Sequence, residues 1–165
     1  MRRPIVCWAL WLAMVGLAPG LGWAQSVTEN QMLAAIVLAD QHGQPGAVDA
    51  ATRAVLLSRD MDGGSLVREA LATDGPAQLE RAGAVYLADV HGMPSLIRRF
   101  VALPRMRERP YRVLLDEEGA PSAVLPSEAG KATWLRLEAL RVVEIRFLTT
   151  SDEVKQALAA VPPGN

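Results

Sequence analysis

The pattern of apolar and polar residues predicts short strands and helices that follow one another along the chain. Two continuous apolar runs, 54–57 and 84–88, are followed by charged residues and are typical of buried strands. Between them, apolar residues recur at helical spacing after Ser65, which predicts a helix with Ser65 as its N-cap. Before them, an apolar run at 32–38 ends at a turn predicted for 40–43.

A second helix is expected to begin at Pro94 and to end near Leu103 and Pro104, since proline suits a first helical turn. Its apolar face is formed by Leu96, Ile97, Phe100, Val101 and Pro104. A third strand is predicted at 111–115 and is closed by a turn at 116–119.

The last part of the chain is predicted to contain a hairpin and a helix. Apolar and charged residues alternate most clearly at 142–148, which pairs with a strand predicted at 133–137. Thr150 and Glu153 have the spacing of a capping box, so a helix is expected to follow. Alternating strands and helices form parallel pairs joined by right-handed crossovers, and the hairpin adds antiparallel strands. The predicted fold class is therefore α/β with a mixed sheet.

This layout resembles the thioredoxin-like superfamily, in particular its secreted branch related to peroxiredoxins and cytochrome-maturation thioredoxins. The resemblance covers residues 32–160, and the order of four segments carries it. They are D-Q-H-G at 40–43, V-L-L-S at 55–58, Y-R-V-L-L-D-E-E-G at 111–119 and A-T-W-L-R-L at 132–137. The resemblance implies a thioredoxin-like three-layer α/β/α sandwich with a mixed central sheet.

The chain departs from the redox-active members of this superfamily at both halves of their site. Those members carry a C-x-x-C motif between the first core strand and its helix, where this chain has Met61, Asp62, Gly63, Gly64 and Ser65. Their cis-proline precedes the antiparallel strand, and no proline occurs at 131–133. The resemblance therefore implies the fold without disulfide exchange.

The amino terminus has the features of a secretory signal peptide. Arg2 and Arg3 precede an uncharged stretch at 5–23, and a small-x-small site ends at Ala24. We expect cleavage after Ala24. An uncleaved anchor remains an alternative, because the stretch approaches the ~20 residues that span a bilayer.

The predicted signal peptide determines the domain organisation and the compartment that we expect. Residues 1–24 form the signal peptide and residues 25–165 a single thioredoxin-like domain, which we expect in the bacterial periplasm or secreted, with no membrane association after cleavage. The only cysteine is Cys7, inside the signal peptide. The mature domain is therefore expected to lack disulfides, thiolate metal sites and cysteine nucleophiles.

Composition excludes further classes. The chain has 165 residues, half of them apolar, with 17 basic and 18 acidic side chains. This balance, together with the export signal, argues against nucleic-acid binding. No cofactor is expected, and the partner is expected to be a protein or a small anionic ligand.

The densest cluster of polar residues follows the first core strand and is the candidate ligand-binding site. Its residues are Arg59, Asp60, Asp62, Gly63, Gly64 and Ser65. Strand-to-helix turns of α/β folds direct backbone N–H groups at ligands. A purely structural turn is the other interpretation of the same residues.

A phosphatase is the alternative enzymatic interpretation of this segment. The sequence V-L-L-S-R-D-M-D-G-G-S-L resembles the D-x-D-G-T motif of haloacid dehalogenase phosphatases. The resemblance implies that Asp60 attacks phosphorus, Asp62 transfers a proton and Mg²⁺ neutralises the phosphate. The chain departs from that motif by an extra glycine before Ser65 and by the absence of a lysine until Lys131.

Two further features are interpreted mainly as surface. The only histidines, His42 and His91, each lie two residues after an aspartate, Asp40 and Asp89, in predicted turns. No metal site is expected from them. Six arginines lie close together at Arg98, Arg99, Arg105, Arg107, Arg109 and Arg112. They are expected to be a solvated face, and an acidic partner or anionic ligand is the alternative.

The function predicted from the sequence is an exported, non-redox thioredoxin-like domain that acts as a binding or accessory module. A small Mg²⁺-dependent phosphatase using Asp60 and Asp62 is the alternative.

Overall fold

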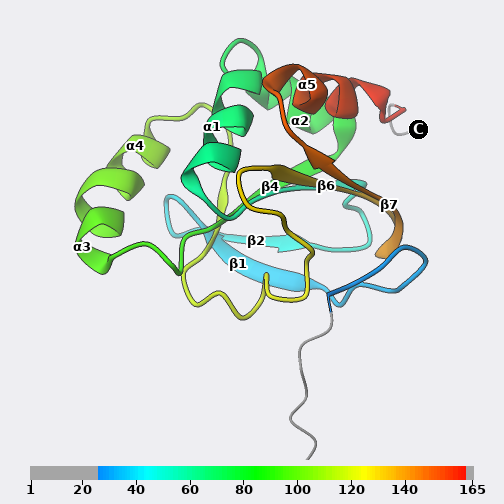
Figure 1. Cartoon of the computed structure of the whole chain (residues 1–165), viewed down its shortest axis with the longest axis horizontal. Helices are drawn as coiled ribbons and strands as arrows, with labels where there is room; N and C mark the ends of the chain where they lie inside the picture. The colour runs from blue at the N-terminus through cyan, green and yellow to red at the C-terminus, as the bar shows by residue number, and fades with distance from the viewer. Residues whose placement is uncertain (1–25, 163–165) are drawn as a thin grey trace, which may run out of the picture.

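Seven strands form one mixed sheet at the centre of the molecule, in the order β2-β1-β5-β4-β3-β6-β7 (Figure 1). The structure is a computed structural model that describes residues 26–162. Strands β3, β4 and β5 are parallel to one another, whereas the pairs at both edges are antiparallel. The strands are β1 Ile36–Asp40, β2 Pro45–Val48, β3 Ala54–Ser58, β4 Ala84–Asp89, β5 Leu114–Asp116, β6 Ala132–Glu138 and β7 Arg141–Leu148.

Helices α1 (Met61–Ala70), α2 (Gly75–Ala82) and α5 (Ser151–Ala160) cover one face of the sheet (Figure 1). Side chains of β3 alternate between the two faces, so Leu56 packs with these helices and Leu57 packs on the opposite side. The larger of the two cores lies beneath the helices and includes the fully buried Trp134.

The opposite face is covered by extended segments instead of a helix. Val27, Leu33 and Leu125 pack there against side chains of the strands. Backbone hydrogen bonds hold the amino-terminal segment in place, from Val27 N to Val124 O and from Asn30 N to Val142 O, both at 2.7 Å. The predicted mixed α/β sandwich is confirmed, and its second outer layer is irregular in the described residues.

Local signals in the sequence correspond to several of these elements. The turn at 40–43 joins β1 and β2, where the Asp40 carboxylate accepts hydrogen bonds from His42 N at 2.8 Å and Gln44 N at 2.9 Å. The predicted capping box at the start of α5 is also confirmed, with both reciprocal bonds between Thr150 and Glu153 present.

Two helices differ from the predictions. Helix α1 begins at Met61, and its N-cap is Asp60, five residues before the expected cap. Ser65 lies inside the helix, so the prediction of Ser65 as the cap is wrong. Helix α2 lies in a segment for which the pattern predicts no helix, and it ends at Gly83 in the left-handed conformation, with φ of 55°.

The predicted helix after Pro94 is longer than expected. It runs without interruption through α3 (Ser95–Ile97), a π-helical turn η1 (Arg98–Ala102) and α4 (Leu103–Arg107), here called helix 95–107. Pro104 has no N–H to donate, and its ring crowds the preceding turn, so the backbone opens to a wider turn there. Leu103 N donates to Arg98 O within that turn. The helix therefore passes Pro104 instead of ending there.

Helix 95–107 lies at one side of the molecule, away from α1, α2 and α5 (Figure 1). Only Met106 among its side chains is buried. No helix within residues 26–162 is long and apolar enough to span a bilayer.

Candidate functional site

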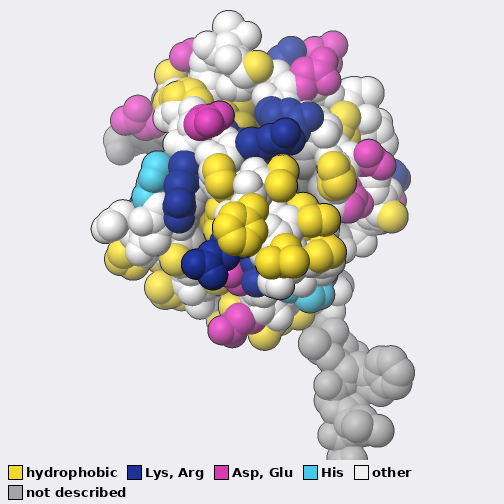
Figure 2. All heavy atoms as spheres, turned by 90° about the vertical axis from the view of Figure 1, so that its left-hand side faces the viewer, with side chains coloured by type: hydrophobic (Ala, Val, Ile, Leu, Met, Phe, Trp, Pro, Cys, Tyr) yellow, Lys and Arg dark blue, Asp and Glu magenta, His cyan; other side chains and the backbone are white. Residues whose placement is uncertain are grey.

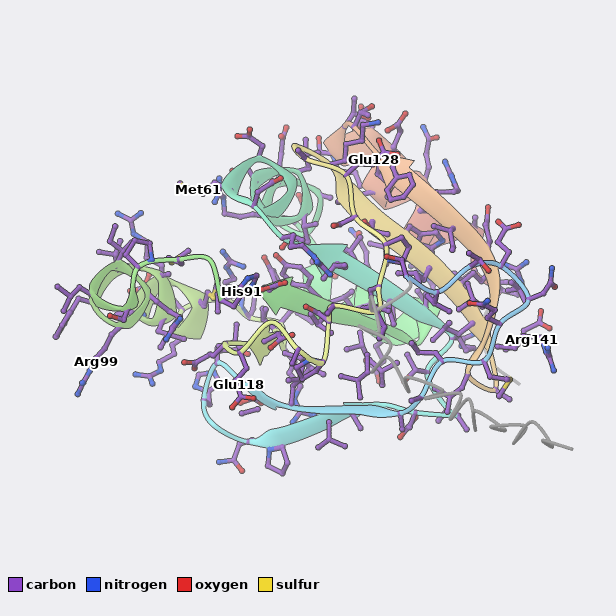
Figure 3. All side chains as sticks on the ribbon, turned by 60° about the horizontal axis from the view of Figure 1, so that its bottom comes forward. Met61, His91, Arg99, Glu118, Glu128 and Arg141 are labelled. Atoms are coloured by element: carbon purple, nitrogen blue, oxygen red, sulfur yellow. The ribbon has the colours of Figure 1, made fainter. Side chains whose placement is uncertain are left out.

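The candidate residues lie at the carboxyl ends of β3 and β4, the edge where open α/β sheets bind ligands. Figure 3 shows His91 there, between the start of α1, marked by Met61, and the loop that contains Glu118. Two arrangements of side chains occupy this edge. One surrounds the first turn of α1, and the other surrounds Asp89.

Asp60 joins the start of α1 to the loop before β6. Its Oδ1 accepts a hydrogen bond from Gly63 N at 2.8 Å, and its Oδ2 accepts one from Gly130 N at 2.6 Å. The first bond caps the helix, and a carboxylate also suits the positive end of the helix dipole. Both carboxylate oxygens of Asp60 are therefore engaged by the backbone.

Gly63 lies directly against the backbone of Lys131. A Cβ atom at Gly63 would be 2.4 Å from the carbonyl oxygen of Lys131 and 2.9 Å from its carbonyl carbon. No side chain fits between the helix and this loop. The first turn of α1 is therefore closed on the side that faces β6.

The remaining residues of this turn point elsewhere. Met61 is 80% exposed and Asp62 is also exposed, whereas Gly64 and Ser65 are partly buried. The structure thus brings Asp60 and Gly63 into one contact with residues 130–131. Met61 and Asp62 are exposed beside Asp60, which is itself exposed.

Arg59 secures a different loop. Its guanidinium donates hydrogen bonds to the carbonyl oxygens of Ser122 and Leu125, and its Nε lies 3.5 Å from the Asp89 carboxylate. The side chain is mostly covered. Arg59 therefore acts as a brace between the end of β3 and the loop that follows β5.

Asp89 is the centre of the second arrangement. Its side chain is 1% exposed, and its carboxylate accepts hydrogen bonds from His91 Nδ1 at 2.7 Å and from Ser122 Oγ at 2.9 Å. Burial alone would raise the pKa of Asp89, but the hydrogen bonds from His91 and Ser122 outweigh it and hold the pKa below its usual value. The carboxylate is therefore stable in its ionised form.

Aspartate, histidine and serine thus meet in one cluster, but their connections differ from those of a hydrolase triad. In a triad the histidine accepts the serine proton. Here Ser122 donates to Asp89, not to His91, and Ser122 is fully buried. The arrangement can orient His91, which is half exposed, but it activates no nucleophile.

The two aspartate-x-histidine pairs remain separate. Asp40 and Asp89 each bind the backbone of their own turn, and the two histidine side chains lie on opposite sides of the face in Figure 2. Within residues 26–162, no group of three or more histidine, cysteine, aspartate or glutamate side chains is placed to hold a metal ion.

No protein-family model and no curated protein matches the chain. Solved structures do match it. Peroxidoxin BcpB from Mycobacterium tuberculosis superposes with a TM-score of 0.54 at 19% identity, covering 81% of this chain and 95% of that one. A putative thiol:disulfide interchange protein DsbE from Chlorobium tepidum superposes with a TM-score of 0.55 at 12% identity, covering 82% and 99%.

The fold is thioredoxin-like. A hypothetical protein, SMc02350 from Sinorhizobium meliloti, shares it with a TM-score of 0.53 at 18% identity, covering 86% of this chain and 90% of that one. The resemblance inferred from the order of the sequence segments is confirmed at the level of the fold.

The resemblance described from the sequence implies that the first turn of α1 corresponds to the C-x-x-C segment and that residues 131–133 correspond to the cis-proline segment. In the structure Gly63, in that turn, lies against the backbone of Lys131. No cis peptide bond occurs in the described part of the chain. These two segments are therefore adjacent in this chain, and backbone contacts hold them together.

The phosphatase interpretation gains no support from this structure. Asp60 would have to leave its oxygens free for phosphorus and Mg²⁺, yet both accept backbone hydrogen bonds. Asp62 lies on the first turn of a helix and is exposed to solvent. The thioredoxin-like neighbours also differ from what the resemblance to haloacid dehalogenases implies.

Three features of this edge are not predicted from the sequence. Each of them joins residues that are distant in the chain. They are the close approach of Gly63 to Lys131, the hydrogen bonds of Arg59 to the loop after β5, and the cluster around Asp89. The one local signal was an aspartate two residues before each histidine, which marks an Asx-type turn.

Replacing Asp60 with alanine is expected to lower the free energy of unfolding by about 1–2 kcal/mol, because it removes the helix cap and the bond to Gly130. Urea denaturation measures the change. Ser65→Ala is the matched control and should change stability by less than about 0.5 kcal/mol, because Ser65 is not a cap. A larger loss in Ser65→Ala than in Asp60→Ala would contradict the assignment of the cap.

Proposed function

We propose that this protein is an exported thioredoxin-like domain that carries out no thiol chemistry and acts as a binding or accessory module. The observation that carries the proposal is the backbone contact between the first turn of α1 and residues 130–131, where Gly63 lies against Lys131 and Gly130 N donates to Asp60. It occupies the position where redox-active relatives hold a reactive thiol beside their substrate. Residues 25–165 also contain no cysteine.

Export is supported by the amino-terminal sequence. Its basic start, uncharged stretch and small-x-small site favour passage through the cytoplasmic membrane and cleavage after Ala24. We place the mature domain in the periplasm or outside the cell. The segment itself lies outside the described residues.

The start of α1 remains the proposed contact surface, formed by the accessible members of the cluster from Arg59 to Ser65. Met61 offers an exposed apolar side chain, and Asp62 a carboxylate beside it. Asp60 and Asp62 place two negative charges at this helix end, which disfavours a small anionic ligand there. A protein that buries Met61 is the better fit.

The purified exported protein is expected neither to reduce insulin disulfides nor to decompose peroxide, because no thiolate is present to attack sulfur or oxygen. Turbidity of insulin in the presence of dithiothreitol and loss of peroxide absorbance measure these activities. A rate indistinguishable from the buffer blank is the expected result.

The double variant Met61→Cys/Gly64→Cys is the matched control, since it places a C-x-x-C pair in the same turn and shows that the assay detects thiols at this position. A Cβ at Gly64 meets no atom closer than 3.7 Å, so the second cysteine fits there. Insulin reduction by the unmodified protein above the blank would contradict the proposal.

A further inference from the structure

The apolar residues whose helical spacing predicts helix 95–107 are exposed on its surface. Leu96 is 70% exposed, Phe100 67%, Ile97 49% and Val101 42%. Figure 2 views this side of the molecule and shows an apolar patch there, with basic side chains beside it. Monomeric proteins seldom expose such contiguous patches unless the patch binds something.

The charges of the same helix all have one sign. The four charged residues of helix 95–107 are Arg98, Arg99, Arg105 and Arg107. Arg98 pairs with Glu117 at 3.2 Å, and Arg107 donates to the carbonyl oxygen of Gln41. Within residues 26–162, Arg99 and Arg105 take part in no ion pair. Figure 3 shows Arg99 directed away from the sheet.

A hollow of about 590 Å³ lies beside this apolar face. Arg98, Arg99 and Arg107 line it together with Phe100 and Leu103, and Glu117, the partner of Arg98, also lies in its wall. Guanidinium groups bind phosphate oxygens in pairs of parallel hydrogen bonds. Because Arg98 is already paired with Glu117, Arg99 is the guanidinium in the hollow that is available to a phosphate group, next to a surface that suits hydrocarbon.

We propose that helix 95–107 docks the exported domain on a membrane surface that contains anionic phospholipids. Leu96, Ile97, Phe100 and Val101 enter the boundary between headgroups and acyl chains, and the arginines bind phosphates above them. The inference goes beyond the proposed binding module, because it needs export but not the contact surface at Met61. It also revises the expectation that the mature domain has no membrane association.

Charge and shape favour a membrane over other occupants. A second copy docked symmetrically would bring the same arginines together, where like charges repel. The patch lies on a helix at the side of the molecule, and a fluid bilayer accommodates such a surface without a complementary groove. A membrane with negative headgroups also neutralises Arg99 and Arg105, which take part in no ion pair within residues 26–162.

The test measures binding of the exported protein to vesicles of phosphatidylethanolamine and phosphatidylglycerol, with phosphatidylcholine vesicles for comparison. We expect sedimentation with the anionic vesicles only, weakening as salt is raised. Leu96→Ser/Phe100→Ser should lower the partition coefficient at least about tenfold, because it removes the inserted side chains. Arg99→Gln/Arg105→Gln should lower it about fivefold for each charge removed.

Two matched controls lie elsewhere on the surface. Val37→Ser changes another exposed apolar residue, on β1, and Arg81→Gln another exposed arginine, on α2; neither should alter binding. Every variant has the same amino terminus as the parent protein, so a retained signal segment cannot produce a difference between them. Circular dichroism verifies that each variant is folded.

Several results would overturn the proposal. Absence of binding to anionic vesicles is one, and equal binding by the parent and Leu96→Ser/Phe100→Ser is another. Loss of binding in millimolar inorganic phosphate at constant ionic strength would assign the hollow to a free anion. A dimer in sedimentation that Leu96→Ser/Phe100→Ser dissociates would assign the face to a second copy. Each of these results leaves the absence of thiol chemistry unaffected.

Discussion

Replacing Gly63 with alanine is expected to lower the free energy of unfolding by about 2–3 kcal/mol. The added Cβ would lie 2.4 Å from the carbonyl oxygen of Lys131, and backbone cannot move aside as a flexible side chain does. Relieving the overlap requires α1 and the loop before β6 to separate. That separation also weakens the hydrogen bond from Gly130 N to Asp60. Urea denaturation followed by circular dichroism gives the change.

The adjacent glycine is a matched control with the opposite expected sign. A Cβ at Gly64 is 3.7 Å from its nearest neighbour, the hydroxyl of Ser58, which is ordinary contact. Gly64→Ala should therefore raise stability by about 0.5–1 kcal/mol, the gain typical of replacing glycine inside a helix. Equal stability of Gly63→Ala and Gly64→Ala would show that α1 does not touch residues 130–131.

Replacing Asp89 with asparagine is expected to lower the free energy of unfolding at neutral pH by about 2–3 kcal/mol, because it leaves Arg59 without its buried partner and weakens the bonds to His91 and Ser122. Asp152→Asn, at a carboxylate that is 78% exposed, is the control and should cost only a few tenths of a kcal/mol.

The pH dependence of this loss follows from the lowered pKa of Asp89. A carboxyl group whose pKa is lower in the folded state contributes stability above the usual carboxyl pKa, near 4, and loses it as the pH falls through the folded value. The difference between the parent protein and Asp89→Asn should therefore be full at pH 7 and shrink below about pH 4. A difference that stays constant down to pH 2 would show that the charge of Asp89 is not what stabilises the cluster.

Local patterns were enough to predict most of the sheet. Buried strands such as β3 and β4 are continuous apolar runs, which predict strands. The capping box of Thr150 and Glu153 predicts the start of α5. Helix α2 escaped prediction because it buries little beyond Leu79 and Ala82, and because Gly75 and Pro76 at its start are typical of a turn. Its position depends on packing against α5 and β4, which no local pattern contains.

The local structure of the candidate segment 59–65 could not be predicted from the sequence. Both Asp60 and Ser65 are suitable caps, and the glycine pair between them made the later start of α1 more plausible. In the structure Asp60 is the cap, and Gly63 lies against Lys131, 68 residues further along the chain. A contact of that range leaves no trace in helical spacing. The hydrogen bonds of Arg59 to the loop after β5 likewise could not be predicted from the local sequence.

Helix 95–107 shows a limit of amphipathic patterns. The spacing of its apolar residues correctly predicts a helix, but not whether the apolar face meets the core, since an apolar face turned to a membrane has the same spacing. For the membrane-facing helix that we propose, the distinguishing signal is the absence of acidic residues between Asp89 and Glu108. Helices packed on a core usually carry both charges on their outer side.

The extended segment that covers the second face of the sheet also affects the order in which the chain folds. Val27 and Asn30 are made first, yet their backbone partners, Val124 and Val142, are made near the end. The backbone hydrogen bonds of the amino-terminal segment therefore cannot all form until β7 has been synthesised. Strands β3 and β4 and helix α1 are close together in the chain and can associate before then. Because the predicted cleavage site after Ala24 lies just before this segment, we expect cleavage during export to precede the pairing of Val27 and Asn30.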